Sequence, residues 1–157
     1  MTEQVAFRLN GQSVSAPPED GQSLLDLLRN TLQLKATRMG CGQGQCGACR
    51  VLLDGQAVAA CETPLWAIEG KSVTTVEGLG SRDAPHALQT AFIEEQAMQC
   101  GFCTSGILMS AAALLQRQPR PSRLEIVQAI DGHLCRCGAH NRVVRAIEKA
   151  AARLAGP

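Results

Sequence analysis

Hydrophobic and polar residues alternate along the first part of the chain with the period of two that is typical of a half-buried β-strand. Residues 5–9 place Val, Phe and Leu at every second position, and Asn10-Gly11 then supplies a two-residue hairpin turn before residues 12–16. Residues 50–60 repeat this arrangement around the turn Asp54-Gly55. The pattern predicts two antiparallel hairpins in the first half of the chain.

A short helix and a last strand complete the predicted sheet unit. Ser23 can cap the helix, and Asp26 follows three residues later, which is the spacing of a capping box. The apolar residues of this helix are Leu24, Leu25, Leu27, Leu28 and Leu32. Residues 71–76 supply the last strand. Two hairpins, one helix and a further strand together predict a β-grasp sheet.

From Pro85 onward the apolar residues follow the three-to-four-residue period of helices. Pro119 and Pro121 end the second of four predicted helices, and Ser122 with Glu125 forms a capping box for the third. The positions expected to be buried are Leu88, Ala91, Phe92 and Met98 in the first helix, Ile107, Leu108, Ala111, Leu114 and Leu115 in the second, Leu124, Val127 and Ile130 in the third, and Val143, Val144, Ile147, Ala151 and Leu154 in the fourth.

The change of period predicts an α+β fold with two domains. Residues 1–78 form the β-grasp domain, and residues 79–157 form an all-α domain of four helices. Within the second domain a helix, a CxxC loop and a helix are followed by a helix, a CxC loop and a helix. This internal repeat predicts pseudo-twofold symmetry, which brings both loops to one end of the bundle and closes a single site there.

Composition excludes several classes of protein. In 157 residues the hydrophobic content of 45% suffices for a packed core, and the net charge of +1 leaves no basic stripe for nucleic acid. No apolar run approaches the roughly 20 residues of a membrane span. The polar start Met1-Thr2-Glu3-Gln4 lacks the features of a signal peptide. We therefore expect synthesis in a reducing cytoplasm, and a periplasmic location only if a partner that carries a signal exports the complex.

The eight cysteines fall into two sets of four, and none is left over. The sets are Cys41, Cys46, Cys49 and Cys61, and Cys100, Cys103, Cys135 and Cys137. The first set has the C-x4-C-x2-C spacing and the distant fourth cysteine of a plant-type ferredoxin, which holds a [2Fe–2S] cluster. The second set reads CxxC, a long gap and CxC. Two complete ligand sets without an obvious catalytic base indicate a protein that carries electrons.

Three other uses of these residues are weighed against this interpretation. A disulfide framework suits short secreted chains, and this chain has no secretion signal in view. Two zinc sites could use the same thiolates, although zinc sites usually pair a CxxC with a second CxxC or with two histidines. A Rieske centre would draw on His86, His133 or His140, but eight cysteines already complete both sets.

The glycines of the first loop fit the cluster interpretation. Gly40, Gly42, Gly44 and Gly47 lie between and beside the cysteines, where they let the backbone take positive φ angles and wrap closely. Backbone N–H groups can then donate to sulfur, which tunes a cluster. The second set is expected near the N-termini of two helices, whose partial positive charge favours an anionic cluster.

With both motifs placed, the chain resembles the small iron–sulfur subunit of the xanthine oxidase family of molybdenum hydroxylases. The matching segments are GCGQGQCGACRV (Gly40 to Val51), QCGFCTSG (Gln99 to Gly106) and LCRCGAHNRVVRAI (Leu134 to Ile147). The resemblance covers almost the whole chain. The last segment is most similar to the two-component members, which include isoquinoline 1-oxidoreductase and nicotinate dehydrogenase.

The resemblance implies a non-catalytic electron-transfer subunit of an oxidoreductase. The first cysteine set would hold a distal [2Fe–2S] cluster and the second set a proximal one. A large partner subunit would carry molybdopterin, in the cytosine dinucleotide form, and Gln99 and Cys137 would contact this pterin. Substrates would be N-heteroaromatic compounds or aldehydes, and a flavin subunit or a cytochrome c would accept the electrons.

A free-standing two-cluster ferredoxin is the alternative function. Such a carrier usually presents a strongly charged docking face, and a chain with a net charge of +1 does not indicate one. Isolation in a complex with a large molybdenum subunit would distinguish the two.

Overall fold

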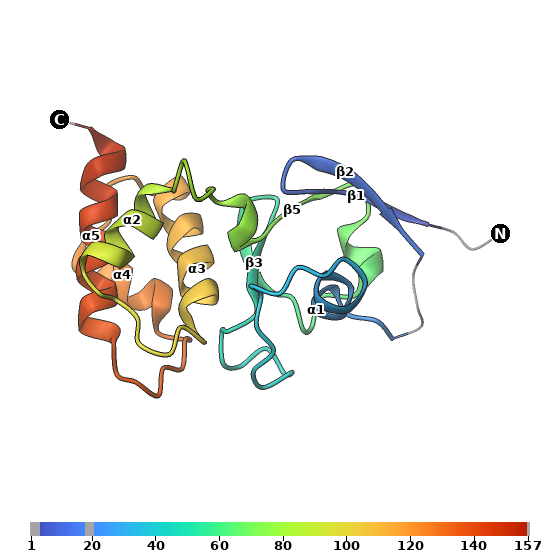
Figure 1. Cartoon of the computed structure of the whole chain (residues 1–157), viewed down its shortest axis with the longest axis horizontal. Helices are drawn as coiled ribbons and strands as arrows, with labels where there is room; N and C mark the ends of the chain where they lie inside the picture. Colours follow the sequence, from blue (N-terminus) through green and yellow to red (C-terminus); the bar gives the residue numbers. More distant parts are fainter. Residues whose placement is uncertain (1–3, 18–20, 157) are drawn as a thin grey trace.

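The structure is a computed structural model that describes residues 4–17 and 21–156. Met1, Thr2 and Glu3, on which the expectation about a leader sequence rests, lie outside these residues. Figure 1 shows a sheet and a group of helices side by side, with β3 (Arg50–Leu53) facing α3 (Thr104–Arg117) where they meet. The predicted α+β arrangement of a β-grasp sheet followed by helices is confirmed.

The described residues contain one five-stranded sheet in the order β2-β1-β5-β3-β4. Its strands are β1 (Val5–Leu9), β2 (Gln12–Ala16), β3 (Arg50–Leu53), β4 (Gln56–Ala59) and β5 (Ser72–Thr74). Both predicted hairpins are confirmed as antiparallel pairs, and β5 joins them by pairing parallel with β1 and antiparallel with β3. The last strand is shorter than predicted, because a 3-10 turn, η3 (Val76–Gly78), follows it closely.

The hairpin turns have the backbone conformation that their sequences predict. Asn10 and Gly11 have φ angles of 51° and 84°, and Asp54 and Gly55 have φ angles of 48° and 81°. Two successive positive φ angles match the right-handed twist of the flanking strands. Asn10 also accepts a hydrogen bond from the N–H of Thr75 at 2.9 Å, which ties the first turn to the end of β5.

The helix of the sheet unit begins as predicted and then continues as a wider, π-helical turn. Ser23 Oγ accepts from the Asp26 N–H at 3.2 Å, which confirms the capping box at the start of α1 (Leu24–Asp26). The following residues form a π-helical turn, η1 (Leu27–Thr31), in which Leu32 N donates to Leu27 O, five residues earlier. The four leucines between positions 24 and 28 are fully buried, and Leu32 is half-buried.

After residue 86 the described chain forms the four predicted helices in the predicted order. They are α2 (Ala87–Glu94), α3 (Thr104–Arg117), α4 (Arg123–Ile130) and α5 (His140–Ala155). The CxxC loop joins α2 to α3, and the CxC loop joins α4 to α5. The capping box of Ser122 and Glu125 at α4 is confirmed. In the sheet unit, η2 (Leu65–Ile68) is a 3-10 turn that the sequence did not predict.

Four residues expected in the core are exposed instead. Met98, Leu124, Val127 and Leu154 have exposed fractions of 52%, 64%, 40% and 49%. Helix α4 buries Ile126 and Ile130, which lie four residues apart, so its buried face is the one beside the predicted face. Met98 lies beyond the end of α2, where a helical period no longer applies, and Leu154 lies in the last turn of α5.

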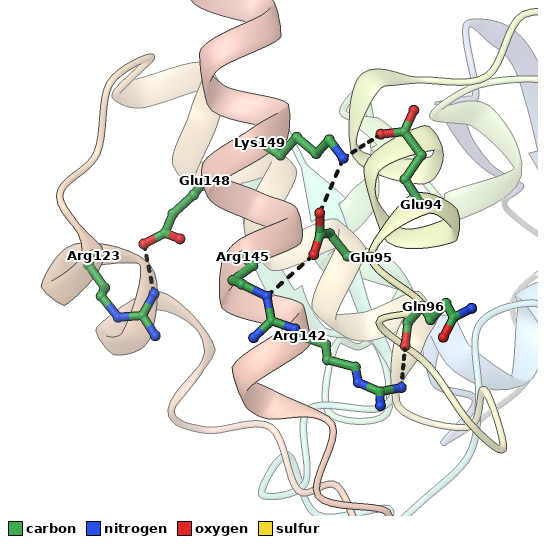
Figure 2. A network of polar contacts seen from close by, with 8 residues as sticks. All are labelled: Glu94, Glu95, Gln96, Arg123, Arg142, Arg145, Glu148 and Lys149. Atoms are coloured by element: carbon green, nitrogen blue, oxygen red, sulfur yellow. Dashed lines mark hydrogen bonds and ion pairs between the residues drawn. The ribbon is translucent and has the colours of Figure 1, made fainter.

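Ion pairs fasten α2 to α5, as Figure 2 shows. Glu94 and Glu95, at the C-terminal end of α2, pair with Lys149 at 2.9 and 3.2 Å, and Glu95 also pairs with Arg145 at 3.3 Å. Arg142 donates to Gln96 O at 3.4 Å. Because α2 leads into the CxxC loop and α5 follows the CxC loop, these contacts fix the positions of the two loops relative to each other.

Two glycines lie where the first cysteine loop meets the helices, beside the packing of Leu52 of β3 into the core of the helices. Gly106, in the first turn of α3, is buried, and a Cβ at this position would overlap Gly47 O in the first cysteine loop. Gly47 is also buried, with a φ angle of 74°, and a Cβ there would overlap the ring of His133. Leu134 N donates to Cys46 O at 3.1 Å across the same boundary. The first cysteine loop therefore lies directly against the segment that enters the CxC loop.

Replacing Gly106 with alanine should destabilise the protein by about 1–3 kcal/mol, because the new methyl group must displace the backbone of Gly47. Helix propensity alone would predict a gain of about 0.5–1 kcal/mol, so a loss isolates the packing effect. Gly132→Ala is the matched control, since nothing lies within 4 Å of a Cβ at Gly132. Thermal unfolding measures both variants, and equal unfolding temperatures for them would contradict this account.

Acid should weaken the attachment of α2 to α5. Lys149, and then Arg145, lower the pKa of Glu95 below its usual 4.5, so the pair stabilises the folded chain above about pH 4.5 and this contribution disappears as the pH falls further. Glu95→Gln removes it at every pH. The decrease in unfolding temperature between pH 7 and pH 3.5 should therefore be smaller in Glu95→Gln than in the parent, by a few degrees at most for an exposed pair.

The control for this measurement is Glu69→Gln, since Glu69 forms no ion pair within the described parts of the chain. It should retain the parent's dependence on pH. An identical acid response in Glu95→Gln and the parent would show that the ion pairs do not stabilise the bundle.

Candidate metal centres

The structure brings the first cysteine set together at the end of the β3–β4 hairpin. Cys49 directly precedes β3, and its C=O accepts from the Ala60 N–H at 3.2 Å, which places Cys61 opposite it. The Cys49 and Cys61 sulfurs lie 3.4 Å apart. Cys41 and Cys46 form a second pair, in which the backbone N–H of each donates to the sulfur of the other, at 3.3 and 3.4 Å.

Backbone N–H groups surround the sulfurs of this loop. Gln43 N, Gln45 N and Cys46 N donate to Cys41 Sγ at 3.3–3.4 Å, and Gly44 N donates to Cys61 Sγ at 3.2 Å. Hydrogen bonds from Gln43 and Cys46 lower the pKa of the Cys41 thiol to about 7. A thiolate is the form of cysteine that binds metal, so the loop prepares Cys41 for this role.

The predicted conformation of the loop glycines holds at three of four positions. Gly42, Gly44 and Gly47 have φ angles of 69°, 67° and 74°. Gly40 does not have a positive φ angle. Its position requires glycine because there is no room for a side chain: a Cβ there would lie only 2.5 Å from Cys46 Sγ.

The second cysteine set assembles from the CxxC and CxC loops. After the Phe102 N–H, Cys137 lowers the pKa of the Cys100 thiol, and after burial, Cys135 raises the pKa of Cys103, so the thiols of the two loops lie near one another. Cys103 directly precedes α3, and α5 begins three residues after Cys137. Gln99 Nε2 donates to Cys137 O at 3.3 Å, which brings the two predicted pterin contacts together. Figure 1 shows the loops of both sets at the lower edge of the molecule.

Burial opposes the anionic form of the inner cysteines. It raises the pKa of Cys49 to about 11 and that of Cys103 to about 12. The Phe102 N–H, in contrast, lowers the pKa of the exposed Cys100 thiol. A bound cation deprotonates a coordinating thiol outright. The inner thiols are therefore suited to a metal-bound state more than to a free thiolate, and the donor sets fit iron–sulfur clusters.

The pairing of sulfurs bears on the choice between iron–sulfur clusters and zinc. A structural zinc site gathers four thiolates around one ion. The first set lies as two close pairs of sulfurs, Cys41 with Cys46 and Cys49 with Cys61, which resembles a centre with two metals, each held by one pair.

Within residues 4–17 and 21–156, no three Cys, His, Asp or Glu side chains are arranged around one ion position. No helix of the described ranges is long and apolar enough to cross a membrane.

The histidines take structural positions. His133 is 4% exposed, its Nε2 lies 2.8 Å from Ser110 Oγ, and burial lowers its pKa to about 4. His140 Nε2 lies 3.2 Å from His133 O, and His86 caps α2 by accepting from the Leu88 N–H at 3.2 Å. Sequence reasoning missed the packing of His133 against Gly47, for which no local pattern gives a signal.

Two further residues next to the first loop were also missed. Arg29 donates to Lys35 O at 2.8 Å and to Thr37 O at 2.6 Å, which fixes the segment that leads into the loop. The carboxylate of Glu62 lies so close over Gly44 that a Cβ at Gly44 would overlap it. Glu62 adjoins Cys61 in the sequence, and this was the one feature of the sequence that could have indicated that Glu62 lies beside the first cysteine loop.

Two protein-family models match the chain. A 2Fe-2S iron-sulfur cluster binding domain matches residues 7–75, and a [2Fe-2S] binding domain matches residues 75–148. The chain is 46% identical over 151 residues to a nicotinate dehydrogenase subunit of Pseudomonas putida, covering 96% of each chain. It is 50% identical over 149 residues to the alpha subunit of isoquinoline 1-oxidoreductase of Brevundimonas diminuta, covering 94% of this chain and 97% of that one.

Two solved structures are also similar. Aldehyde oxidoreductase from Desulfovibrio desulfuricans has a TM-score of 0.94 and 43% identity, covering 98% of this chain, which spans only 17% of that protein. Quinoline 2-oxidoreductase from Pseudomonas putida has a TM-score of 0.88 and 38% identity, covering 95% of this chain and 92% of that one. The chain therefore belongs to the small iron–sulfur subunits of the xanthine oxidase family of molybdenum hydroxylases.

Proposed function

We propose that the chain is the electron-transfer subunit of a molybdenum hydroxylase, linking the molybdopterin centre of a large partner subunit to an external acceptor. The observation that carries this proposal is the presence of two four-cysteine sites in one chain. In the first the sulfurs lie as two pairs, and in the second the CxxC and CxC loops meet where Gln99 Nε2 donates to Cys137 O. The identity of 46–50% to subunits of nicotinate dehydrogenase and isoquinoline 1-oxidoreductase supports it.

The eight cysteines divide between two [2Fe–2S] clusters in this proposal. Cys41, Cys46, Cys49 and Cys61 would hold the distal cluster, and their sulfurs lie as the pairs Cys41–Cys46 and Cys49–Cys61. Cys100, Cys103, Cys135 and Cys137 would hold the proximal cluster. When bound, each cluster supplies one-electron redox chemistry. The loop N–H groups stabilise negative charge on sulfur, which favours the reduced state.

The face around the second set is the proposed docking surface for the large subunit. Met98, Phe102 and Leu134, with exposed fractions of 52%, 47% and 70%, lie within two residues of Cys100, Cys103 or Cys135. Exposed apolar side chains gathered at one site are typical of protein interfaces. Gln99 and Cys137 lie on this face and would contact the pterin. This apolar face favours a subunit of a complex over the alternative, a free ferredoxin.

The finer features of the complex follow from the relatives. The pterin is proposed to be the cytosine dinucleotide form, and the substrate an N-heteroaromatic compound or an aldehyde, since relatives are named for nicotinate, isoquinoline and aldehyde. A cytochrome c or a flavin subunit is the proposed acceptor. We propose a cytoplasmic location, or a periplasmic one after export with a partner. The domain boundary is proposed between residues 78 and 79, where η3 ends before the segment leading to α2.

Low-temperature EPR of the dithionite-reduced complex, with iron and sulfide quantified, tests the cluster assignment. The parent should show two S = 1/2 signals and about four irons per chain. Cys103→Ser should lose one signal and about two irons, and it should stop turnover, because the proximal site has lost a ligand. Cys41→Ser is the matched variant and should lose the other signal.

The two variants distinguish the possible failures. Loss of the same signal in both would overturn the assignment of the two cysteine sets to separate clusters. Full activity in Cys103→Ser would remove the second set from the electron path. A colourless parent protein with two bound zinc ions would overturn the proposed function.

A further inference from the structure

A cavity of about 680 Å³ lies between the β3–β4 hairpin and the helices α3 and α4. Figure 1 shows β3 facing α3 at this place. Its volume is within the range of cavities that bind small molecules. The polar side chains in its lining include Arg50, Asp54, Ser110, Gln116, Arg117 and His133, and we call this space the hairpin cavity.

Arg50 lies on the side of β3 that faces this cavity, away from the first cysteine set. Successive side chains of a strand point to opposite faces of the sheet. Cys49 and Val51 pack in the core of the sheet unit, whereas Leu52 packs in the core of the helices. Arg50 therefore shares the helical side of β3 with Leu52, and the thiols of Cys49 and Cys61 lie on the other side.

The guanidinium of Arg50 leaves most of its N–H donors without a partner. Within the described ranges its one side-chain hydrogen bond, to Ala57 O, is long at 3.4 Å, and it forms no ion pair. Arg50 is only half-exposed, and after burial it is the next cause that lowers the pKa of His133, so the two side chains are close. A half-buried guanidinium with free donors is suited to an oxyanion, which it binds through parallel hydrogen bonds.

Ser110 and His133 form the buried part of the lining. They are 7% and 4% exposed, and His133 Nε2 lies 2.8 Å from Ser110 Oγ. His133 Nδ1 is buried and has no hydrogen-bond partner among the described residues. A proton on Nε2, donated to Ser110 Oγ, is therefore the tautomer that leaves no ring N–H unpaired. The hydroxyl proton of Ser110 is then free to be donated to a molecule in the cavity.

The other charges near the cavity have both signs. Arg117 lies in the last turn of α3, where it also complements the negative end of the helix. The carboxylate of Asp54 accepts from Ser72 N at 2.9 Å. A cluster held by the first cysteine set would add negative charge on the far side of β3, and this charge opposes an anion in the cavity. Binding of an anion therefore depends on the direct hydrogen bonds from Arg50 and Ser110 more than on net charge.

We propose that the hairpin cavity binds a small molecule through an oxyanion, a carboxylate or phosphate group, that pairs with Arg50 and accepts from Ser110 Oγ. Gln116 lies across the cavity from the hairpin, because a Cβ at Gly55 would lie 3.5 Å from Gln116 Oε1. Its amide can hydrogen-bond the rest of the ligand. The site needs no cluster and no large subunit, so it goes beyond the proposed function.

Isothermal titration calorimetry of the oxidised complex of both subunits with inorganic phosphate, at constant ionic strength, tests the proposal. The oxidised complex is chosen because the negative charge of the clusters is then smallest. The parent should bind about one phosphate per copy of this chain at the hairpin cavity, with a Kd of about 1 mM or lower. Arg50→Gln should weaken this binding at least about tenfold, because it removes a charge-assisted pair, and Ser110→Ala at least about threefold.

Two further variants make the comparison specific. Arg120→Gln is the matched control, since Arg120 is an exposed arginine in the loop after α3 and is not among the residues that line the cavity. It should follow the parent. Arg50→Lys keeps the charge but lacks the forked donors, so its affinity should lie between those of the parent and Arg50→Gln. Circular dichroism of every variant checks the fold, and Arg50→Lys and Ser110→Ala give the same comparison if Arg50→Gln does not fold.

The contrary outcomes are separable. Absence of phosphate binding by the parent, or equal affinities in Arg50→Gln and Arg120→Gln, would overturn the proposal. Release of the large subunit by Arg50→Gln, seen as a change in native mass, would make the cavity part of the contact between subunits and overturn it as well. EPR signals of the reduced parent report on the proposed function independently, because phosphate binding at Arg50 requires neither cluster.

Discussion

One backbone hydrogen bond, from Leu134 N to Cys46 O, joins the first cysteine loop to the segment that enters the CxC loop, and the packing around it constrains the rest of the structure. Beside this bond the first loop approaches α3 without an intervening side chain, at Gly47 and Gly106. The ring of His133 lies against Gly47, and its Nε2 lies 2.8 Å from Ser110 Oγ. The sheet and the bundle are therefore joined at the candidate sites as well as through Leu52 of β3, and the clusters that these sites are proposed to hold would be fixed relative to each other.

Within each cysteine set the thiols have opposite environments. Backbone N–H groups lower the pKa of the outer thiols Cys41 and Cys100, whereas burial raises the pKa of the inner thiols Cys49 and Cys103. If these cysteines are metal ligands as proposed, the fold favours the thiolate at the outer positions, and the inner thiols would depend on the charge of the metal for deprotonation. Metal binding would then be coupled to the formation of the core around the inner thiols.

The exposed apolar residues beside the second set bear on the proposed contact with the large subunit. Met98, Phe102 and Leu134 accompany this set, in the part of the chain where ion pairs join α2 to α5. Exposed apolar side chains gathered at one site are typical of protein interfaces.

Local chemistry made much of the fold predictable. Asn10-Gly11 and Asp54-Gly55 set the hairpins, and Ser23 and Ser122 set two helix starts, because each depends on residues within a few positions. The cysteine spacing also predicted which four thiols the structure brings together, while their roles as ligands remain a prediction. Only the tertiary structure decided which face of α4 is buried, that Met98 is exposed, and that Gly47, Gly106 and His133 meet. These features depend on contacts between residues far apart in the chain, for which a single sequence carries no periodic signal.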